Sequence, residues 1–206
     1  MMTLTDSPTS PFVRKVNALI LERGLGRLIE RVPTDPWNDQ DPLPQTNPLG
    51  KVPALTLDDG RVLVDSTLIC EYLDSLEGGP QLFPDAGPAR WRALALHNLG
   101  DGIATAAVAI VIETLRRPKD KVHEGWVERQ RDKIRRTLDV LETHAAAGEL
   151  EEPVTIGSLT IAVALGYLDF RRPEIAWRDG HPKLAAWYES FSQRPSLADT
   201  APKAPA

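Results

Sequence analysis

Apolar residues follow one spacing in the first third of the chain and another in the rest. Up to about residue 76, short apolar runs alternate with runs at helical spacing. Residues 3–5 and 27–32 read as strands. Between them, a helix is predicted to begin after Ser10-Pro11 and to end at residues 23–26, because glycine commonly follows the last turn of a helix. This stretch therefore predicts a β-α-β unit.

A proline-rich segment separates this unit from a second group of elements. Residues 33–48 contain five prolines in sixteen positions, which predicts an irregular loop. Residues 52–64 form two apolar runs around a glycine-containing turn, a pattern typical of a β-hairpin. Residues 66–76 carry their apolar side chains on one helical face, with Ser66 as the expected N-cap. The predicted order here is β-β-α.

The rest of the chain reads as helix after a stretch dense in glycine and proline. The helices predicted from residue 89 to about 116 and over residues 155–170 are apolar on most faces, so we expect both at the centre of a bundle. Two further helices, near residues 126–141 and over 181–196, complete it. The predicted division is a domain of residues 1–77, a linker of residues 78–88, and an all-helical domain of residues 89–206.

Composition and charge narrow the class of protein. The chain has 206 residues, 42% hydrophobic and 26% charged, as expected of a soluble globular protein. A net charge of −5 argues against nucleic acid or an anionic membrane as the partner. The arginines of residues 128–139 are interleaved with aspartates at helix-surface spacing. The most apolar run, residues 103–112, is too short to span a bilayer, and the N-terminus lacks the pattern of a secretory signal. We therefore expect a cytoplasmic protein.

The cysteine and histidine residues predict neither a disulfide nor a metal site. Cys70 is the single cysteine, so an internal disulfide is excluded, and we expect this thiol to be packed and inert. The four histidines, at positions 97, 123, 144 and 181, do not follow the spacing of metal ligands. We expect no metal site.

Three motifs carry a family resemblance. "SPFVRKV" opens the first helix, "NPLGKVPAL" (47–55) precedes the hairpin, and "VDSTLICEYL" (64–73) follows it. With the order of elements around them, these motifs resemble the cytosolic glutathione S-transferase family, and bacterial members of the serine type in particular. The resemblance implies a thioredoxin-like α/β N-terminal domain, an all-α C-terminal bundle, glutathione as co-substrate and a homodimer.

The resemblance also assigns roles to single residues. The Val52-Pro53 bond is expected to be cis, which leaves the Val52 backbone as a strand edge that pairs with the peptide part of glutathione. Lys51 would supply a cation toward the glycyl carboxylate. Ser66, at a helix N-terminus, would bind the γ-glutamyl carboxylate, and Asp65 would pair with the ammonium group. Many members have glutamate at the Asp65 position, so this side chain is one methylene shorter.

Ser10 is the leading candidate for the residue that contacts the glutathione sulfur. It stands where thioredoxin-like redox proteins carry the first cysteine of a C-P-x-C motif, and both sulfurs are missing here, so dithiol exchange has no nucleophile. Lowering a thiol pKa by two units takes about 2.7 kcal/mol. A hydrogen bond to the thiolate supplies roughly 1.5–3 kcal/mol and a helix N-terminus about 0.3–1 kcal/mol. Ser7, Thr9 and a plain capping role for Ser10 stay open.

The second substrate is expected to meet the long apolar helix. Asp101, Thr105, Ile112 and Arg116 recur at roughly helical spacing and could line an electrophile site. Asp101 could instead reach glutathione across a dimer interface, and Arg116 with Arg117 more often just complements the dipole at a helix C-terminus. The function implied is a detoxifying glutathione transferase that adds the glutathione thiolate to a hydrophobic or electrophilic small molecule. The alternative is a glutathione-binding regulatory or carrier protein of the same fold.

Overall fold

The computed structural model describes residues 1–151 and 153–203, which form two compact units. The first unit consists of Met1–Phe83 together with the chain from Pro195 onward, and the second of Pro84–Arg194. The sequence-based division differs at the end of the chain, which it grouped with the helical domain. The segment from Pro195 joins the first unit because the Arg14 guanidinium donates to the Leu197 carbonyl over 3.1 Å.

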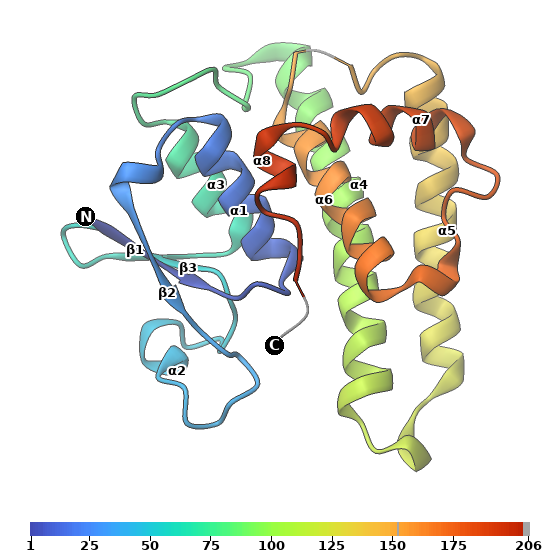
Figure 1. Cartoon of the computed structure of the whole chain (residues 1–206), viewed down its shortest axis with the longest axis horizontal. Helices are drawn as coiled ribbons and strands as arrows, with labels where there is room; N and C mark the ends of the chain where they lie inside the picture. The colour runs from blue at the N-terminus through green and yellow to red at the C-terminus, as the bar shows by residue number, and fades with distance from the viewer. Residues whose placement is uncertain (152, 204–206) are drawn as a thin grey trace. The chain divides into compact units, whose positions relative to one another are not determined.

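The first unit is a four-stranded sheet with helices packed on it (Figure 1). The strand order is β2-β1-β3-β4; β1 pairs parallel with β2, and β3 pairs antiparallel with both β1 and β4. The β-α-β and β-β-α order predicted from the sequence is confirmed. The elements are β1 (Met2–Asp6), α1 (Pro11–Glu22), η1 (Gly26–Leu28), β2 (Ile29–Pro33), α2 (Leu43–Thr46), β3 (Ala54–Thr56), β4 (Val62–Val64), α3 (Ser66–Asp74) and α8 (Pro195–Ala198).

Local chemistry fixes both ends of α1. Ser10 is extended, with φ −83° and ψ 125°, and its Oγ accepts a hydrogen bond from the Val13 N–H, so it is the N-cap. Pro11 occupies the first helical position, where the missing N–H has no intrahelical acceptor to lose. Gly24, at φ 67°, turns the chain away after the last turn. Between these ends, most residues of α1 are buried.

The stretch predicted to be a linker is partly packed into the first unit. The carboxylate of Asp74 accepts the N–H groups of Leu82 and Phe83, each over 2.9 Å, and pairs with Arg23 at 3.3 Å. Arg23 and Asp74 are both nearly inaccessible to solvent. A Cβ at Gly78 would lie 2.5 Å from the Arg23 carbonyl oxygen, so only glycine fits. Tertiary contacts, which composition does not reveal, therefore order the beginning of this segment.

The second unit is all-helical, as predicted. Its elements are α4 (Gly87–Val111), a π-helical turn η2 (Ile112–Arg116), η3 (Lys119–Lys121), α5 (Glu124–Ala146), α6 (Ile156–Arg171), η4 (Pro173–Ile175) and α7 (Pro182–Phe191). Every residue from Ile156 to Leu168 is buried, which places α6 at the centre of the bundle. The helix predicted from residue 89 to about 116 corresponds to α4 and η2 together. Its geometry changes from α to π at Ile112.

Small residues allow α4 and α6 to approach closely. A Cβ added at Gly100 would lie 2.8 Å from the Ile161 nitrogen, and one at Gly157 would lie 2.7 Å from the Ala93 carbonyl oxygen. The 30 helical residues Gly87–Arg116 are long and apolar enough to cross a membrane, with a mean hydropathy of 1.5 over the best window. α4 packs against α6, so its apolar residues are those of a core helix.

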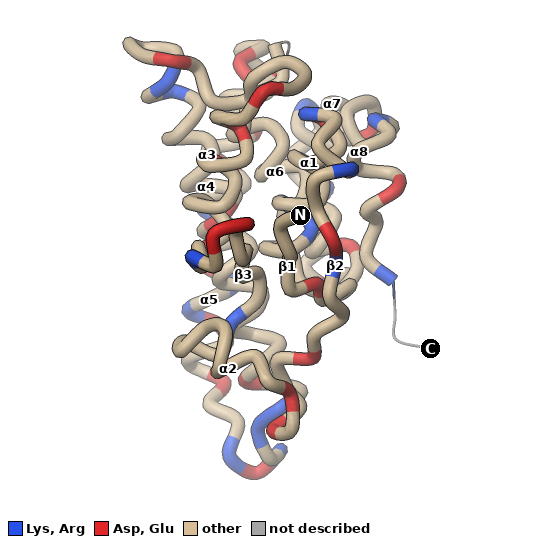
Figure 2. The backbone as a smooth tube through the Cα atoms, turned by 90° about the vertical axis from the view of Figure 1, so that its left-hand side faces the viewer, with Lys and Arg blue, Asp and Glu red and all other residues tan. Residues whose placement is uncertain are grey.

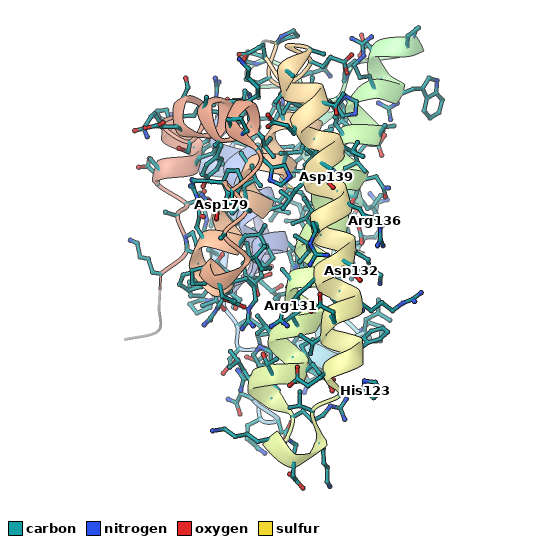
Figure 3. The ribbon with its side chains drawn as sticks, turned by 90° about the vertical axis from the view of Figure 1, so that its right-hand side faces the viewer. His123, Arg131, Asp132, Arg136, Asp139 and Asp179 are labelled. Carbon is teal, nitrogen blue, oxygen red and sulfur yellow. The ribbon has the colours of Figure 1, made fainter. Side chains whose placement is uncertain are left out.

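The charged face of α5 carries ion pairs along the helix. Arg135 contacts Asp132 at 2.5 Å, and Arg131 contacts Glu128 at 3.4 Å. The labelled side chains of α5 extend from the helix in Figure 3. The interpretation of residues 128–139 as helix-surface pairs is confirmed for Asp132. Asp139 differs, because its carboxylate lies 3.0 Å from His181, the residue just before α7, instead of pairing with an arginine of its own helix.

We predict opposite effects for alanine at two neighbouring glycines of α4. Gly100→Ala should lower the free energy of unfolding by about 1–3 kcal/mol, because the methyl group would press on the backbone of α6. Gly102→Ala should raise it by about 0.5–1 kcal/mol, since a Cβ there has nothing within 4 Å and alanine favours helix. Urea unfolding of both variants checks this. Equal effects would mean that α4 and α6 are not in close contact.

Candidate functional site

Sheet register brings the three sequence motifs of the first unit to one edge of the sheet. Because β3 is antiparallel to β1, the end of β1 lies beside the beginning of β3 at Ala54. Ala54 in turn pairs with Val64, the last residue of β4. The turn into α1, the loop before β3 and the turn into α3 therefore all start from the same edge. Figure 2 looks onto β3, β1 and β2 lying side by side.

Ser10 presents a hydroxyl at this edge, at the N-terminus of α1. Its Oγ accepts from the Val13 N–H over 3.3 Å, and its own N–H donates to the Ser7 carbonyl over 3.1 Å. A hydroxyl has one hydrogen to donate in addition to its acceptor sites. Capping the helix therefore leaves the Ser10 O–H available for an acceptor beyond the helix end.

The other two hydroxyls of the "DSPTSP" stretch lie in different surroundings. Ser7 is only 8% exposed and lines a cavity together with Asp6 and Asn17. Thr9 is half-buried in the turn that precedes the helix. Ser10 alone occupies the capping position, which the sequence favoured without excluding the other two.

The loop before β3 is organised by Asn47, a residue that the sequence analysis did not single out. Its side-chain oxygen accepts the Leu49 N–H over 3.0 Å, and its amide nitrogen donates to the Lys51 carbonyl over 2.7 Å. Asn47 is 1% exposed. The sequence "NPLG" contains a signal for this role, because asparagine side chains often accept a hydrogen bond from the backbone two residues on, here at Leu49.

After this loop the chain reaches β3 through a cis peptide bond. The Val52-Pro53 bond is cis, as expected. Within the described residues, the backbone of Val52 has no hydrogen-bond partner, and its side chain is half-buried. Ladder pairing resumes only at Ala54, whose N–H donates to the Thr5 hydroxyl over 2.7 Å. Val52 therefore offers an unpaired strand edge, with the exposed Lys51 beside it.

The turn into α3 differs from its prediction by one residue. Asp65, not Ser66, is the N-cap of α3: its carboxylate accepts the Thr67 N–H over 2.8 Å. Asp65 has φ 78° and ψ 127°, a conformation that side-chain-bearing residues rarely adopt. Ser66 becomes the first residue of the helix and is 4% exposed. Its N–H belongs to the first turn, which has no intrahelical acceptor and attracts anions.

The Asp65 carboxyl is held in its charged form. Partial burial alone would raise its pKa, but the hydrogen bonds from Thr67 and the N–H of Leu68, together with the positive charge of Lys15, outweigh burial and lower the pKa below its ordinary value of 3.8. Lys15 lies on α1 and is 1% exposed. The turn therefore presents a carboxylate at neutral pH next to a helix end that favours anions, and could hold an ammonium and a carboxylate together.

The predicted electrophile-site residues belong to the second unit. Asp101 is half-buried and Thr105 exposed on α4, and Arg116 is exposed at the end of η2. The neighbouring Arg117 pairs with Glu113 at 2.9 Å, a contact across the π-helical turn. Among the residues that the structure describes, no group of three or more His, Cys, Asp or Glu side chains could hold a metal ion.

We predict that glycine is better tolerated than alanine at position 65. Both substitutions remove the capping carboxylate, but only glycine adopts a positive φ without strain, so Asp65→Gly should be more stable than Asp65→Ala by about 1 kcal/mol or more. The same two substitutions at Ser75, the C-cap of α3 with φ −76°, should rank in the opposite order. Urea unfolding measures all four. A more stable alanine variant at position 65 would show that the turn is unstrained.

The charge of Asp65 should make its contribution depend on pH. Because its pKa is lowered in the folded state, the carboxylate stabilises the fold above the unfolded value of 3.8, and this stabilisation is lost as the pH falls through the folded pKa. An asparagine at this position would keep a capping oxygen without the charge, so Asp65→Asn should lie below the parent in stability at neutral pH and converge with it in acid. Unfolding curves between about pH 2 and 7 check this; a constant difference would contradict it.

The chain matches two family models over most of its length. One is described as the N-terminal domain of glutathione S-transferase and matches residues 4–81, and the other as its C-terminal domain and matches residues 124–190. The uncharacterized GST-like protein YibF of Escherichia coli K12 is 38% identical over 202 residues, 98% of each chain.

Solved structures agree with the family models. A glutathione transferase family member from Pseudomonas fluorescens Pf-5 with bound glutathione is 47% identical, with a TM-score of 0.94 over 99% of this chain and 100% of that one. A glutathione S-transferase from Methylobacillus flagellatus KT with bound GSH is 33% identical, with a TM-score of 0.91 over 98% and 100%. This chain therefore belongs to the glutathione S-transferase family.

Proposed function

We propose that this protein is a glutathione transferase that binds glutathione at the sheet edge of the first unit and stabilises its thiolate with Ser10. The observation that carries the proposal is the strand register, which gathers Ser10, the unpaired Val52 backbone and the Asp65-Ser66 turn at one edge. Two relatives, 47% and 33% identical, have glutathione bound in their structures, which supports glutathione as the ligand here.

Each part of glutathione has a complementary group at this edge. The Val52 backbone would pair with the cysteinyl unit as an added strand, with Pro53 fixing the direction of the chain. The first turn of α3 at Ser66 would bind the γ-glutamyl carboxylate, and the charged Asp65 its ammonium group. Lys51, exposed beside Val52, would face the glycyl carboxylate.

Ser10 would then act on the sulfur as a hydrogen-bond donor. Its Oγ accepts from Val13 while its O–H points its hydrogen to the thiolate, so one side chain caps the helix and binds the sulfur. A charged hydrogen bond of roughly 1.5–3 kcal/mol and a helix end worth about 0.3–1 kcal/mol are enough to lower the thiol pKa by about two units. No general base is needed, because the thiolate itself is the nucleophile.

The reaction would be completed by an electrophilic small molecule. Asp101, Thr105 and Arg116 of the second unit stay candidates either for contact with the electrophile or for contact with a partner subunit. A family member from Pseudomonas fluorescens Pf-5, 45% identical, holds S-(propanoic acid)-glutathione, a glutathione substituted on sulfur, as the product of such a transfer would be. A detoxifying role follows from this chemistry.

We further propose that the protein is a cytoplasmic homodimer. The first unit exposes large apolar side chains at Leu49 (65%) and Leu68 (48%), and the second unit does so at Trp91 (69%) and Trp126 (44%). Exposed apolar surface of this kind is commonly covered by a partner, and a second copy of the chain is the partner that the family resemblance implies.

We predict that Ser10→Ala raises the pKa of the bound glutathione thiol. Ultraviolet absorbance of the thiolate, recorded with saturating glutathione across pH 5–9, should shift toward the ordinary thiol pKa of about 8.5, and turnover should fall tenfold or more. The variant also loses a helix cap, so its stability should fall by about 1 kcal/mol, which urea unfolding measures separately.

Ser7→Ala and Thr9→Val serve as matched controls, because they remove the neighbouring hydroxyls without touching the cap of α1. A thiolate signal lost in one of these variants and kept in Ser10→Ala would assign the sulfur contact to that residue instead. Glutathione binding without any thiolate signal or turnover in the parent protein would favour the regulatory or carrier role.

A further inference from the structure

A cavity of about 280 Å³ lies along α1 in the first unit, outside the residues assigned to glutathione. Its walls come from the end of β1 and the turn after it, from one face of α1, from β2, and from the chain that follows α8. The volume is that of a small ligand, near the lower end of the range for protein pockets.

Charged and amide side chains form a connected row through this cavity. The Asn17 amide nitrogen donates to Asp6 over 2.8 Å, and the Asn17 oxygen accepts from the Nε of Arg31 over 2.8 Å. Within this row from β1 through α1 to β2, Asn17 is 9% exposed, Asp6 is half-buried and Arg31 is exposed. The hydrogen bond to Asn17 holds the Nε of Arg31 at the cavity wall.

Positive charge exceeds negative charge around the cavity. Arg14, Arg31 and Lys203 line it, against the two carboxylates of Asp6 and Asp199. Arg14 is 8% exposed and is positioned by the hydrogen bond from its Nη2 to the Leu197 carbonyl. Figure 2 shows basic positions on β2 and near the end of the described chain. Arg31 and Lys203 are exposed and Arg14 is buried, and two guanidinium groups and an ammonium around one small cavity favour a carboxylate.

Ser7 adds a hydroxyl group to the wall of the cavity. Its side chain is 8% exposed and lines the cavity, yet its hydroxyl has no hydrogen-bond partner among the residues that the structure describes. The hydroxyl oxygen itself keeps contact with solvent, so a ligand in the cavity would exchange with water there. A ligand oxygen in the cavity would pair with this hydroxyl.

The cavity is connected to Ser10 by the geometry of α1. Side chains spaced by three or four positions share one face of a helix, and Arg14, Asn17 and Leu21 of the cavity wall continue the face on which Ser10 stands. Ser7 and Pro8, which belong to the turn that ends at Ser10, also line the cavity. Ser7, Pro8 and Arg14 stand at the end of the cavity nearest Ser10, so a small molecule bound at that end would lie beside the Ser10 turn.

From this arrangement we propose that the preferred electrophiles are small carboxylic acids, whose carboxylate is bound in the α1 cavity by Arg31, Arg14 and Ser7. The inference rests on the proposed function, in which glutathione supplies the thiolate at Ser10. With a 2-halo acid, the sulfur forms a bond to the methylene carbon, the carbon–halogen bond breaks, and halide leaves with the bonding electrons. The thiol proton is released to solvent.

Iodoacetate and iodoacetamide form a matched pair for the test. Both have iodide as the leaving group, and the reacting carbon carries a charged carboxylate in the first and a neutral amide in the second. At saturating glutathione, the rate with protein is divided by the rate with glutathione alone for each compound. We expect this acceleration to be at least tenfold larger for iodoacetate. In Arg31→Met the ratio of the two accelerations should fall to about one, and Arg31→Lys should restore part of it.

Arg27→Gln is the control, since Arg27 is an exposed arginine on η1 that does not line the cavity, and it should keep the parent ratio. Because the readout is a ratio, a general loss of folded protein cancels. Equal acceleration of both compounds by the parent, or an unchanged ratio in Arg31→Met, overturns the inference and leaves the transferase intact. No acceleration of either compound, with glutathione bound in calorimetry, overturns the proposed chemistry and this inference with it.

Discussion

The antiparallel pairing of β3 with both β1 and β4 is the interaction from which the candidate site is built. It sets Ala54 beside the end of β1 and opposite Val64, so that three turns far apart in sequence begin at one edge. A slip of one residue would turn Leu55, which is fully buried, toward the other face of the sheet. The register that buries the core therefore also determines where the polar groups of the site meet.

The two helices that start at this edge are capped by side chains that also keep a group for a ligand. Ser10 caps α1 with its oxygen and keeps a hydrogen to donate, whereas Asp65 caps α3 from a strained backbone and keeps its negative charge. Strain of about 1–3 kcal/mol at Asp65 is tolerated because the strands on one side and the helix on the other fix the turn. The strained turn at Asp65 thus makes the site less stable than an unstrained turn would.

Sequence patterns were sufficient for the order of elements, the central position of α6 and the capping role of Ser10, because these depend on residues close together in the chain. The same patterns misplaced the cap of α3, since the positive φ of Asp65 is imposed by the turn and not by residue preference. They also passed over Asn47, and they treated the segment fastened by Asp74 as a linker, because both depend on contacts that folding alone creates.

The position of α8 has a consequence for how the chain acquires its structure during synthesis. Residues that follow the whole helical unit supply the Leu197 carbonyl that accepts from Arg14 and the Ser196 hydroxyl that donates to Glu22, both on α1. The sheet is translated before the helical unit, but it lacks this covering until the residues from Pro195 have been made. The helical unit, which is continuous in sequence, is complete before Pro195 is reached, so of the two units the one whose translation starts earlier is packed later.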